Sequence, residues 1–240
     1  VNSITFDNLK KSWKVSAKYR QENLVYYATD VVYTLPPQSL LKHLGNSFDT
    51  SPFYKKRIQS LPQPSGALVF YSALKKEHIN SLSSNHYQFI ADELGSLFVS
   101  ISEEGDGRAP RGEITLIASL FTKTKEWFNL EKNEYTKKKE VYLQKISFAL
   151  ENQFGISCQN WLHRELATPL GFERWTNRPN GIVGGLGQSP DNFGLFGLSS
   201  RTPFRGLWLC GDSIYPGEGT AGVSQSALMV SRQILASKGI

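Results

Sequence analysis

The stretch Leu209–Ile234, LCGDSIYPGEGTAGVSQSALMVSRQI, is the part of the chain that decides the fold. It begins apolar, turns at Gly211-Asp212, crosses a loop rich in glycine and proline, and continues with apolar residues at helical spacing. This order predicts a short buried strand, a loop, and a helix that begins near Thr220 or Ala221. Because ligands of open α/β sheets bind beyond the carboxyl ends of the strands, a ligand is expected beside this loop.

The residues of the loop suit a dinucleotide better than a bare phosphate. The carboxylate of Asp212 repels a phosphate, but it accepts hydrogen bonds from the hydroxyls of a sugar or a ribityl chain. The free N–H groups and the positive end of the following helix stabilise a group that becomes anionic, such as the ring of a reduced flavin. The spacing alone leaves a second interpretation open, in which Asp212 caps the helix of an ordinary β–α turn.

Length and composition predict one large folded domain or two small ones. The chain has 240 residues, of which 40% are hydrophobic and 20% charged. It contains no run of about 18 apolar residues, the length needed to cross a bilayer, and no signal peptide. The sequence begins without Met, which predicts a processed piece or a fragment of a longer protein. The two cysteines and four scattered histidines predict neither a disulfide framework nor a metal site.

The net charge of +6 includes three small basic clusters, Lys10-Lys11, Lys55-Lys56-Arg57 and Lys137-Lys138-Lys139. Each cluster by itself is typical of a solvated surface. Together they favour attraction to lipid headgroups over nucleic acid, because no nucleic-acid-binding motif accompanies them. The expected location is peripheral association with the cytoplasmic side of a membrane.

The remaining pattern predicts strands first, a mixed block in the middle, and a strand–loop–helix at the end. Alternation and apolar runs predict five strands, at 12–20, 31–34 (fully buried), 66–74, 95–102 and 113–121. Helical spacing predicts helices at 38–44 and 133–154. The glycine- and proline-rich stretch 161–204 predicts irregular structure.

The final helix carries a wide apolar stripe that predicts burial against a sheet or a bound group. The stripe comprises Val223, Ala227, Val230 and Ile234, with Leu228 and Leu235 beside it.

Four segments resemble the flavin amine oxidase superfamily, and within it the branch of phytoene desaturases and carotenoid isomerases. They are ATDVVYTLPP, ATPLGFERWTNRPNGIVGG, FGLFGLSSRTP and GLWLCGDSIYPGEGTAGVSQSAL. The subgroup that they resemble most is the cyanobacterial-type carotenoid 3,4-desaturases. The resemblance implies an α/β (mixed α+β) fold, in which a partial Rossmann-like FAD-binding domain carries an inserted substrate domain built on a mixed or antiparallel sheet plus helices. It implies that 1–35 and 176–240 belong to the FAD-binding domain and that 36–175 bind substrate.

The resemblance also assigns residues to the site. Those expected at FAD are Gly211, Asp212, Gly219, Thr220, Ala221, Gly222 and Val223. Those expected beside the substrate are Phe172, Arg174, Gly184 and Gly185. The nearest candidates for proton handling are Glu173 and Glu218.

One departure from the superfamily is large, since the N-terminal β–α–β unit with its G-x-G-x-x-G fingerprint is missing. Gly185-x-Gly187 is a false match, because Pro190 stands where the third glycine belongs and neither a strand nor a helix flanks it. The implied function is FAD-dependent desaturation or isomerisation of a lipophilic polyene, as part of a longer or two-part protein. Two alternatives stay open: a small-molecule oxidoreductase of the amine oxidase type, and a non-catalytic half-protein that complements an N-terminal half.

Overall fold

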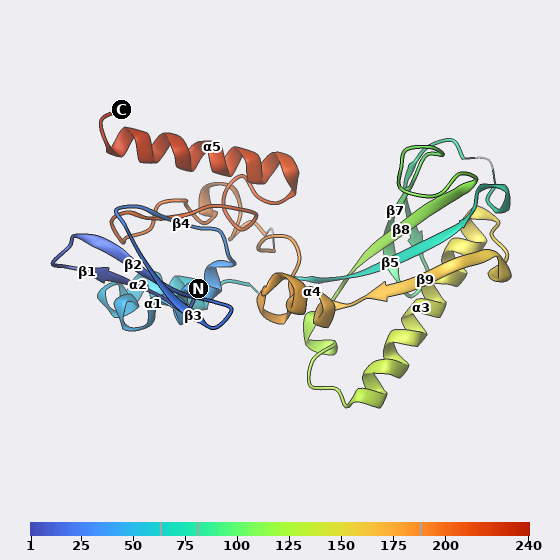
Figure 1. Ribbon diagram of the computed structural model, residues 1–240, viewed down its shortest axis with the longest axis horizontal. Coiled ribbons are helices and arrows are strands. Elements are labelled where there is room, and N and C mark those ends of the chain that lie inside the picture. The colour runs from blue at the N-terminus through green and yellow to red at the C-terminus, as the bar shows by residue number, and fades with distance from the viewer. Residues whose placement is uncertain (63, 81, 188) are drawn as a thin grey trace. The chain divides into compact units, whose positions relative to one another are not determined.

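The computed structural model describes residues 1–62, 64–80, 82–187 and 189–240. The chain folds into two compact units, each with its own core (Figure 1). The first unit combines the two ends of the chain, Val1–Pro64 and Gly184–Ile240, and the second unit is Ser65–Val183. Among the described residues, no helix is both long and apolar enough to cross a membrane.

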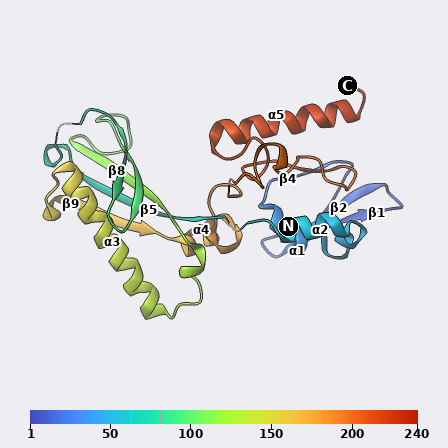
Figure 2. The same ribbon diagram turned by 180° about the vertical axis from the view of Figure 1, so that it is seen from behind.

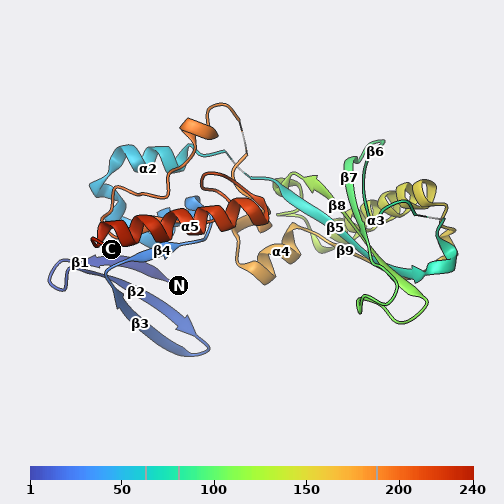
Figure 3. The same cartoon turned by 90° about the horizontal axis from the view of Figure 1, so that it is seen from above.

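The first unit contains two small sheets. Three strands form an antiparallel meander, β1 (Ser3–Asp7), β2 (Ser12–Tyr19) and β3 (Glu22–Ala28). Two further strands pair in parallel, β4 (Val31–Tyr33) and β10 (Leu207–Leu209). The α-helices of this unit are α1 (Leu40–Leu44), α2 (Pro52–Gln59) and α5 (Gly219–Ser237). Figure 3 views the unit from above, with α5 lying over β4.

The core of the first unit explains why its boundary differs from the domain boundary at 35/36 predicted from the sequence. Ile4 and Trp13 of the meander share one buried cluster with Leu40, Phe48 and Ile58, which follow that boundary. The compact unit therefore continues to Pro64. The predicted names of the domains, FAD-binding and substrate-binding, stay predictions.

The second unit is a five-stranded antiparallel sheet in the order β6-β7-β8-β5-β9. Its strands are β5 (Gly66–Lys75), β6 (His86–Ala91), β7 (Gly95–Ile101), β8 (Glu113–Thr122) and β9 (Trp161–Ala167). Its α-helices are α3 (Lys132–Phe154) and α4 (Pro169–Thr176). The unit ends at Val183, later than the boundary predicted at 175/176. The N–H of Val183 donates to the carbonyl of Ser65 (3.0 Å), so the two ends of the unit are joined.

Helix α3 covers one face of this sheet (Figure 2). A capping box between Glu131 and Glu134 begins the helix, and Gly155 ends it in the left-handed conformation (φ 66°). Ile146 and Leu150 pack into the core that the sheet provides. Burying each such side chain contributes about 1.5–3 kcal/mol, so the helix and this face stabilise each other.

The other face of the five-stranded sheet carries half-buried and exposed apolar side chains. Because successive residues of a strand point to opposite faces, Leu68 and Phe70 lie in the core while their neighbours on β5 point away from it. We call this surface the open face and define it by Val69, Tyr71, Phe98, Ile117 and Phe121.

The structure confirms the mixed α/β fold class and the strands predicted from alternation, and it corrects three expectations. The run 31–34 is not fully buried: β4 has a single partner strand, and Val32 is 43% exposed. The stretch 161–204 is not irregular throughout, because it contains β9 and α4. Within the expected stripe of α5 only Val230 is buried, and Leu228 is 53% exposed.

Candidate functional site

Strand β10, the loop after it and helix α5 form the strand–loop–helix unit that the sequence predicted. All three residues of the strand are buried, and the N–H of Cys210 continues the parallel ladder by donating to the carbonyl of Tyr33 (3.0 Å). The chain leaves the sheet at Gly211, whose N–H donates to Oγ of Ser226 on α5 (3.1 Å). This hydrogen bond therefore joins the C-terminal end of β10 to α5.

Ser226 was missed by the sequence analysis. It is 1% exposed, and its hydroxyl lies against both the Gly211 amide and Sγ of Cys210 (3.8 Å). The only signal in the sequence was a polar residue one position before the apolar Ala227, which is too common on helices to indicate a contact.

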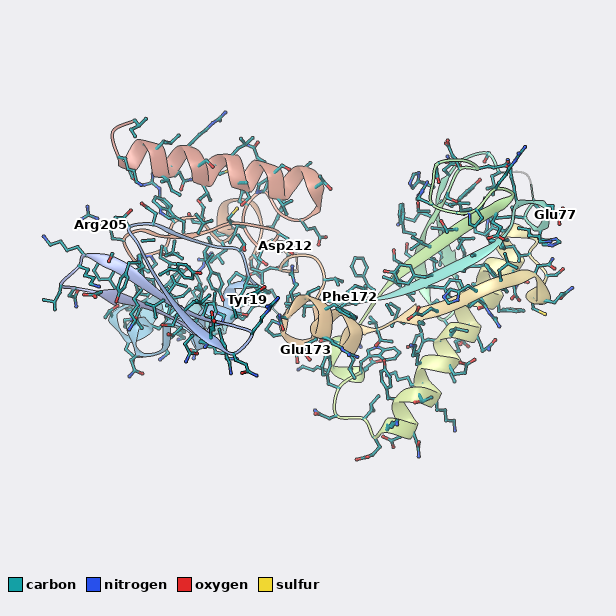
Figure 4. All side chains as sticks on the ribbon, in the orientation of Figure 1. Tyr19, Glu77, Phe172, Glu173, Arg205 and Asp212 are labelled. Atoms are coloured by element: carbon teal, nitrogen blue, oxygen red, sulfur yellow. The ribbon has the colours of Figure 1, made fainter. Side chains whose placement is uncertain are left out.

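Asp212 lies in the loop between β10 and α5 (Figure 4). Its side chain is half-buried, and its Oδ1 accepts a hydrogen bond from the hydroxyl of Ser213 (3.2 Å). Asp212 lines a cavity of about 20 Å³ together with Leu186, Tyr215 and Gly217. That volume holds about one water molecule, so the cavity cannot enclose a dinucleotide.

Gly184 and Gly185 lie against this loop from a distant part of the sequence. The N–H of Gly185 donates to Oε2 of Glu218 (3.1 Å), the residue that precedes α5. A Cβ atom on Gly185 would lie 1.9 Å from the carbonyl oxygen of Asp212, and one on Gly184 would lie 2.1 Å from Oε2 of Glu218. We call these four residues the glycine clasp. At position 185, only glycine permits so close an approach of the two backbone segments.

The start of α5 is an exposed, positive helix end. Glu218 is at the N-cap position, but its side chain reaches Gly185 and makes no cap hydrogen bond to the helix. Gly219, Thr220 and Ala221 are exposed, and no acidic side chain lies in the first turn. The backbone N–H groups of a first helical turn have no partners within the helix, so this end can stabilise negative charge.

Gly222 and Val223 complete the predicted cofactor residues. A Cβ atom on Gly222 would lie 2.4 Å from the carbonyl oxygen of Gly217, so the loop folds back closely onto the helix. Val223 is half-buried. The structure therefore brings the seven predicted cofactor residues together within one loop and one helical turn and a half.

The C-terminal part of α5 is held by Asp30. Its carboxylate accepts a hydrogen bond from Nε1 of Trp208 (2.9 Å) and forms an ion pair with Lys238 (3.0 Å). Burial acts to raise the pKa of Asp30, but the hydrogen bonds from Trp208, Lys238 and Thr29 and the charge of Lys238 outweigh it, and the pKa is lowered. Helix α5 is thus held near its middle, through Ser226, and at its C-terminal end, through Lys238.

Three predicted residues belong to the other unit. Phe172, Glu173 and Arg174 lie on α4 of the second unit, where Figure 4 labels the first two, whereas Gly184 and Gly185 belong to the first unit. Oε1 of Glu173 accepts a hydrogen bond from the N–H of Asn180 (2.9 Å). Both carboxylates predicted for proton handling, Glu173 and Glu218, therefore accept a hydrogen bond from a backbone amide.

Comparison with known proteins finds relatives over part of the chain. No protein-family model matches the sequence. It is 30% identical over 149 residues to the chloroplastic prolycopene isomerase of Daucus carota, which covers 61% of this chain and 24% of that protein. It is 30% identical over 155 residues to the chloroplastic prolycopene isomerase of Arabidopsis thaliana, with 63% and 26% covered. The chain thus spans about a quarter of the length of the curated relatives that it matches.

Solved structures share the fold over nearly the whole chain. An oxidoreductase from Methanosarcina mazei superposes with a TM-score of 0.59 and 14% identity, over 97% of this chain and 48% of that one. A putrescine oxidase variant with redesigned cofactor binding superposes with a TM-score of 0.59 and 16% identity, over 97% and 46%. The chain is related to the prolycopene isomerases, and its fold corresponds to about half of these oxidoreductase chains.

Proposed function

We propose that this chain is the C-terminal part of an FAD-dependent oxidoreductase that desaturates or isomerises a long apolar polyene. The observation that carries the proposal is the buried strand β10, which delivers Gly211 and Asp212 to the exposed start of α5. The similarity to prolycopene isomerases supports a polyene as the substrate class.

The residues present fit one end of FAD. A half-buried carboxylate at Asp212 suits the ribityl hydroxyls. The exposed helix start at Gly219–Ala221 suits the ring end, where negative charge develops on reduction. When bound, FAD supplies a two-electron acceptor. The sequence contains no glycine fingerprint that would bind the adenine and pyrophosphate end of FAD. We therefore assign the binding of that end to an N-terminal half.

Glu218 and Glu173 fit the role of positioning residues better than that of proton donors. Each holds a backbone amide, of Gly185 in one case and of Asn180 in the other. Glu218 keeps Gly184 and Gly185 beside the loop of Asp212, so it shapes the surface that the substrate meets. Phe172 and Arg174 stay proposed neighbours of the substrate.

The open face of the five-stranded sheet is the proposed surface for the polyene. Four apolar side chains of β5 and β7, those of Leu68, Phe70, Leu97 and Val99, are fully buried in the core. Val69, Tyr71 and Phe98 belong to the open face and are free of that core. An apolar chain that binds to such a surface leaves water, and its binding is stabilised by about 25 cal/mol per Å² of apolar area buried.

Flavin retention tests the cofactor part of the proposal. The chain is expressed alone and together with a separately supplied N-terminal half, and the visible absorbance of oxidised flavin is recorded after gel filtration. We expect flavin only when both halves are present, and less of it with Asp212→Ala. The matched control is Asp191→Ala, an exposed aspartate of the same unit, which should retain flavin fully. Stoichiometric flavin in the chain alone would remove the need for a second half.

Product analysis separates the three candidate functions. The reconstituted protein is given a carotenoid in vesicles and, in parallel, putrescine as an amine. Conversion of the carotenoid supports the proposal, whereas oxidation of the amine supports the amine oxidase alternative. Bound flavin with neither product supports the non-catalytic half-protein.

A further inference from the structure

The antiparallel meander presents a basic face that neither the core nor the candidate site uses. In the register of the sheet, Lys14 lies opposite Tyr27 and Ser16 lies opposite Val25. These residues share the face turned away from Trp13, which is buried in the core. We define the basic face by Lys10, Lys14, Lys18, Val25 and Tyr27.

The charge on this surface is mainly positive. Residues 8–21 contain Lys10, Lys11, Lys14, Lys18 and Arg20 and no acidic residue. Asp7, which precedes them, uses its Oδ1 to accept hydrogen bonds from the N–H groups of Leu9 and Lys10 (both 3.0 Å). That carboxylate shapes the turn between β1 and β2, and the basic side chains of residues 8–21 outnumber it.

Apolar and aromatic side chains accompany the lysines. Leu9, at the tip of the turn that Asp7 shapes, is 97% exposed. Tyr27 is 46% exposed, and Nζ of Lys10 lies 3.6 Å from the centre of its ring. Exposed leucine, tyrosine and lysine side chains together are what the boundary between headgroups and acyl chains accommodates, because each places an apolar body beside a polar tip.

The same contact argues against single-stranded nucleic acid. A base that stacks on an aromatic side chain needs a free face of the ring, and Lys10 covers one face of Tyr27. Figure 3 shows the hairpin of β2 and β3 extending away from α5.

We propose that the basic face, with Leu9 at its edge, docks the protein on a bilayer that contains anionic lipid. The choice of lipid rests on the proposed function, because a polyene dissolves in the acyl region of a membrane. Three lysines near an anionic surface strengthen binding about fivefold each, and therefore roughly 100-fold together.

Vesicle co-sedimentation of the full chain tests the proposal. The vesicles contain phosphatidylcholine alone or with about a third of phosphatidylserine, at low and at physiological salt. The variant is Lys10→Gln, Lys14→Gln and Lys18→Gln combined. The charge-matched control replaces three exposed lysines of the second unit, Lys123, Lys125 and Lys132, in the same way. We expect the wild type and the control to bind the anionic vesicles, and the variant to bind roughly 100-fold more weakly.

A labelling measurement on the wild type does not depend on how the variant folds. An amine-reactive reagent is applied with and without vesicles, and modification of each lysine is read by mass spectrometry. Anionic vesicles should protect Lys10, Lys14 and Lys18 and leave Lys123 and Lys132 unchanged.

Three results would overturn the proposal: equal loss of binding in the control, equal binding to neutral vesicles, or binding to an RNA oligomer with none to vesicles. Neither flavin nor polyene is needed, so a failure of the proposed function leaves the vesicle result interpretable. The triple variant should also retain flavin like the wild type when both halves are present.

Discussion

Replacing Gly185 by alanine should destabilise the first unit, because the backbone of Asp212 occupies the space of the new methyl group. The added Cβ would lie 1.9 Å from the carbonyl oxygen of Asp212 and 2.5 Å from its carbonyl carbon. Contact distances of roughly 3.5 Å are needed, so one of the two backbone segments has to move by about 1.6 Å. Overpacking of this kind costs about 3 kcal/mol, and the lower entropy of the unfolded chain offsets about 1 kcal/mol.

The net loss of about 2 kcal/mol lowers the Tm by roughly 4–8 °C. The assay is thermal unfolding, with hydrogen exchange at the amides of β10 to identify the transition of the first unit. Gly187→Ala is the matched control, because a Cβ atom there meets nothing within 4 Å. It should leave the Tm unchanged or raise it slightly. Equal Tm values for the two variants would refute the close approach in the glycine clasp.

Three further predictions follow from particular contacts. Glu218→Ala should lose about 1 kcal/mol of stability in urea unfolding, since the Gly185 amide loses its acceptor, whereas Glu218→Gln should retain most of it. Leu68→Ala, in the core, should cost about 2–5 kcal/mol, and Val69→Ala, on the open face, clearly less, measured by urea unfolding of the second unit. Because the pKa of Asp30 is lowered in the folded state, its carboxylate contributes to stability fully above about pH 4, and this contribution is lost as the pH falls through the folded-state pKa. Wild type and Asp30→Asn should therefore differ in urea midpoint at pH 7 and converge on acidification. A constant difference between those two proteins down to pH 2 would contradict the last prediction.

The sequence predicted those parts of the fold that depend on local pattern. Alternation in 12–20 and 113–121 gave strands, and helical spacing before Gly155 gave α3, because both signals depend only on which face of one element is buried. Within the five-stranded sheet, the strands that the sequence did not predict are β6 and β9, which lie at its two edges. An edge strand has one partner and is only partly buried, so its sequence carries a weaker apolar signal.

The sequence predicted only those parts of the candidate site whose residues are neighbours in the chain. Glycine, aspartate and the helix start stand next to one another between Gly211 and Val223, and their order indicated a ligand site directly. The hydrogen bond from Gly185 to Glu218 joins residues 33 positions apart, and no periodic pattern encodes it. A glutamate before a helix most often acts on that helix, so its use as an acceptor for a distant loop required the folded structure.

The parallel pair of β4 and β10 constrains how the proposed N-terminal half could join this chain. The edge of β10 opposite β4 is not open, because the N–H of Leu209 donates to the carbonyl of Ser200 (2.8 Å) and the hydroxyl of Thr202 donates to the carbonyl of Leu207 (2.6 Å). A strand added at that edge has to displace both bonds, at a net cost of about 1 kcal/mol each. A new strand would form backbone hydrogen bonds of similar strength with β10. A sheet of three or more strands is also stable, whereas a sheet of two strands is only marginally stable. Joining the halves at β10 is therefore favourable only if the segment around Ser200 moves aside.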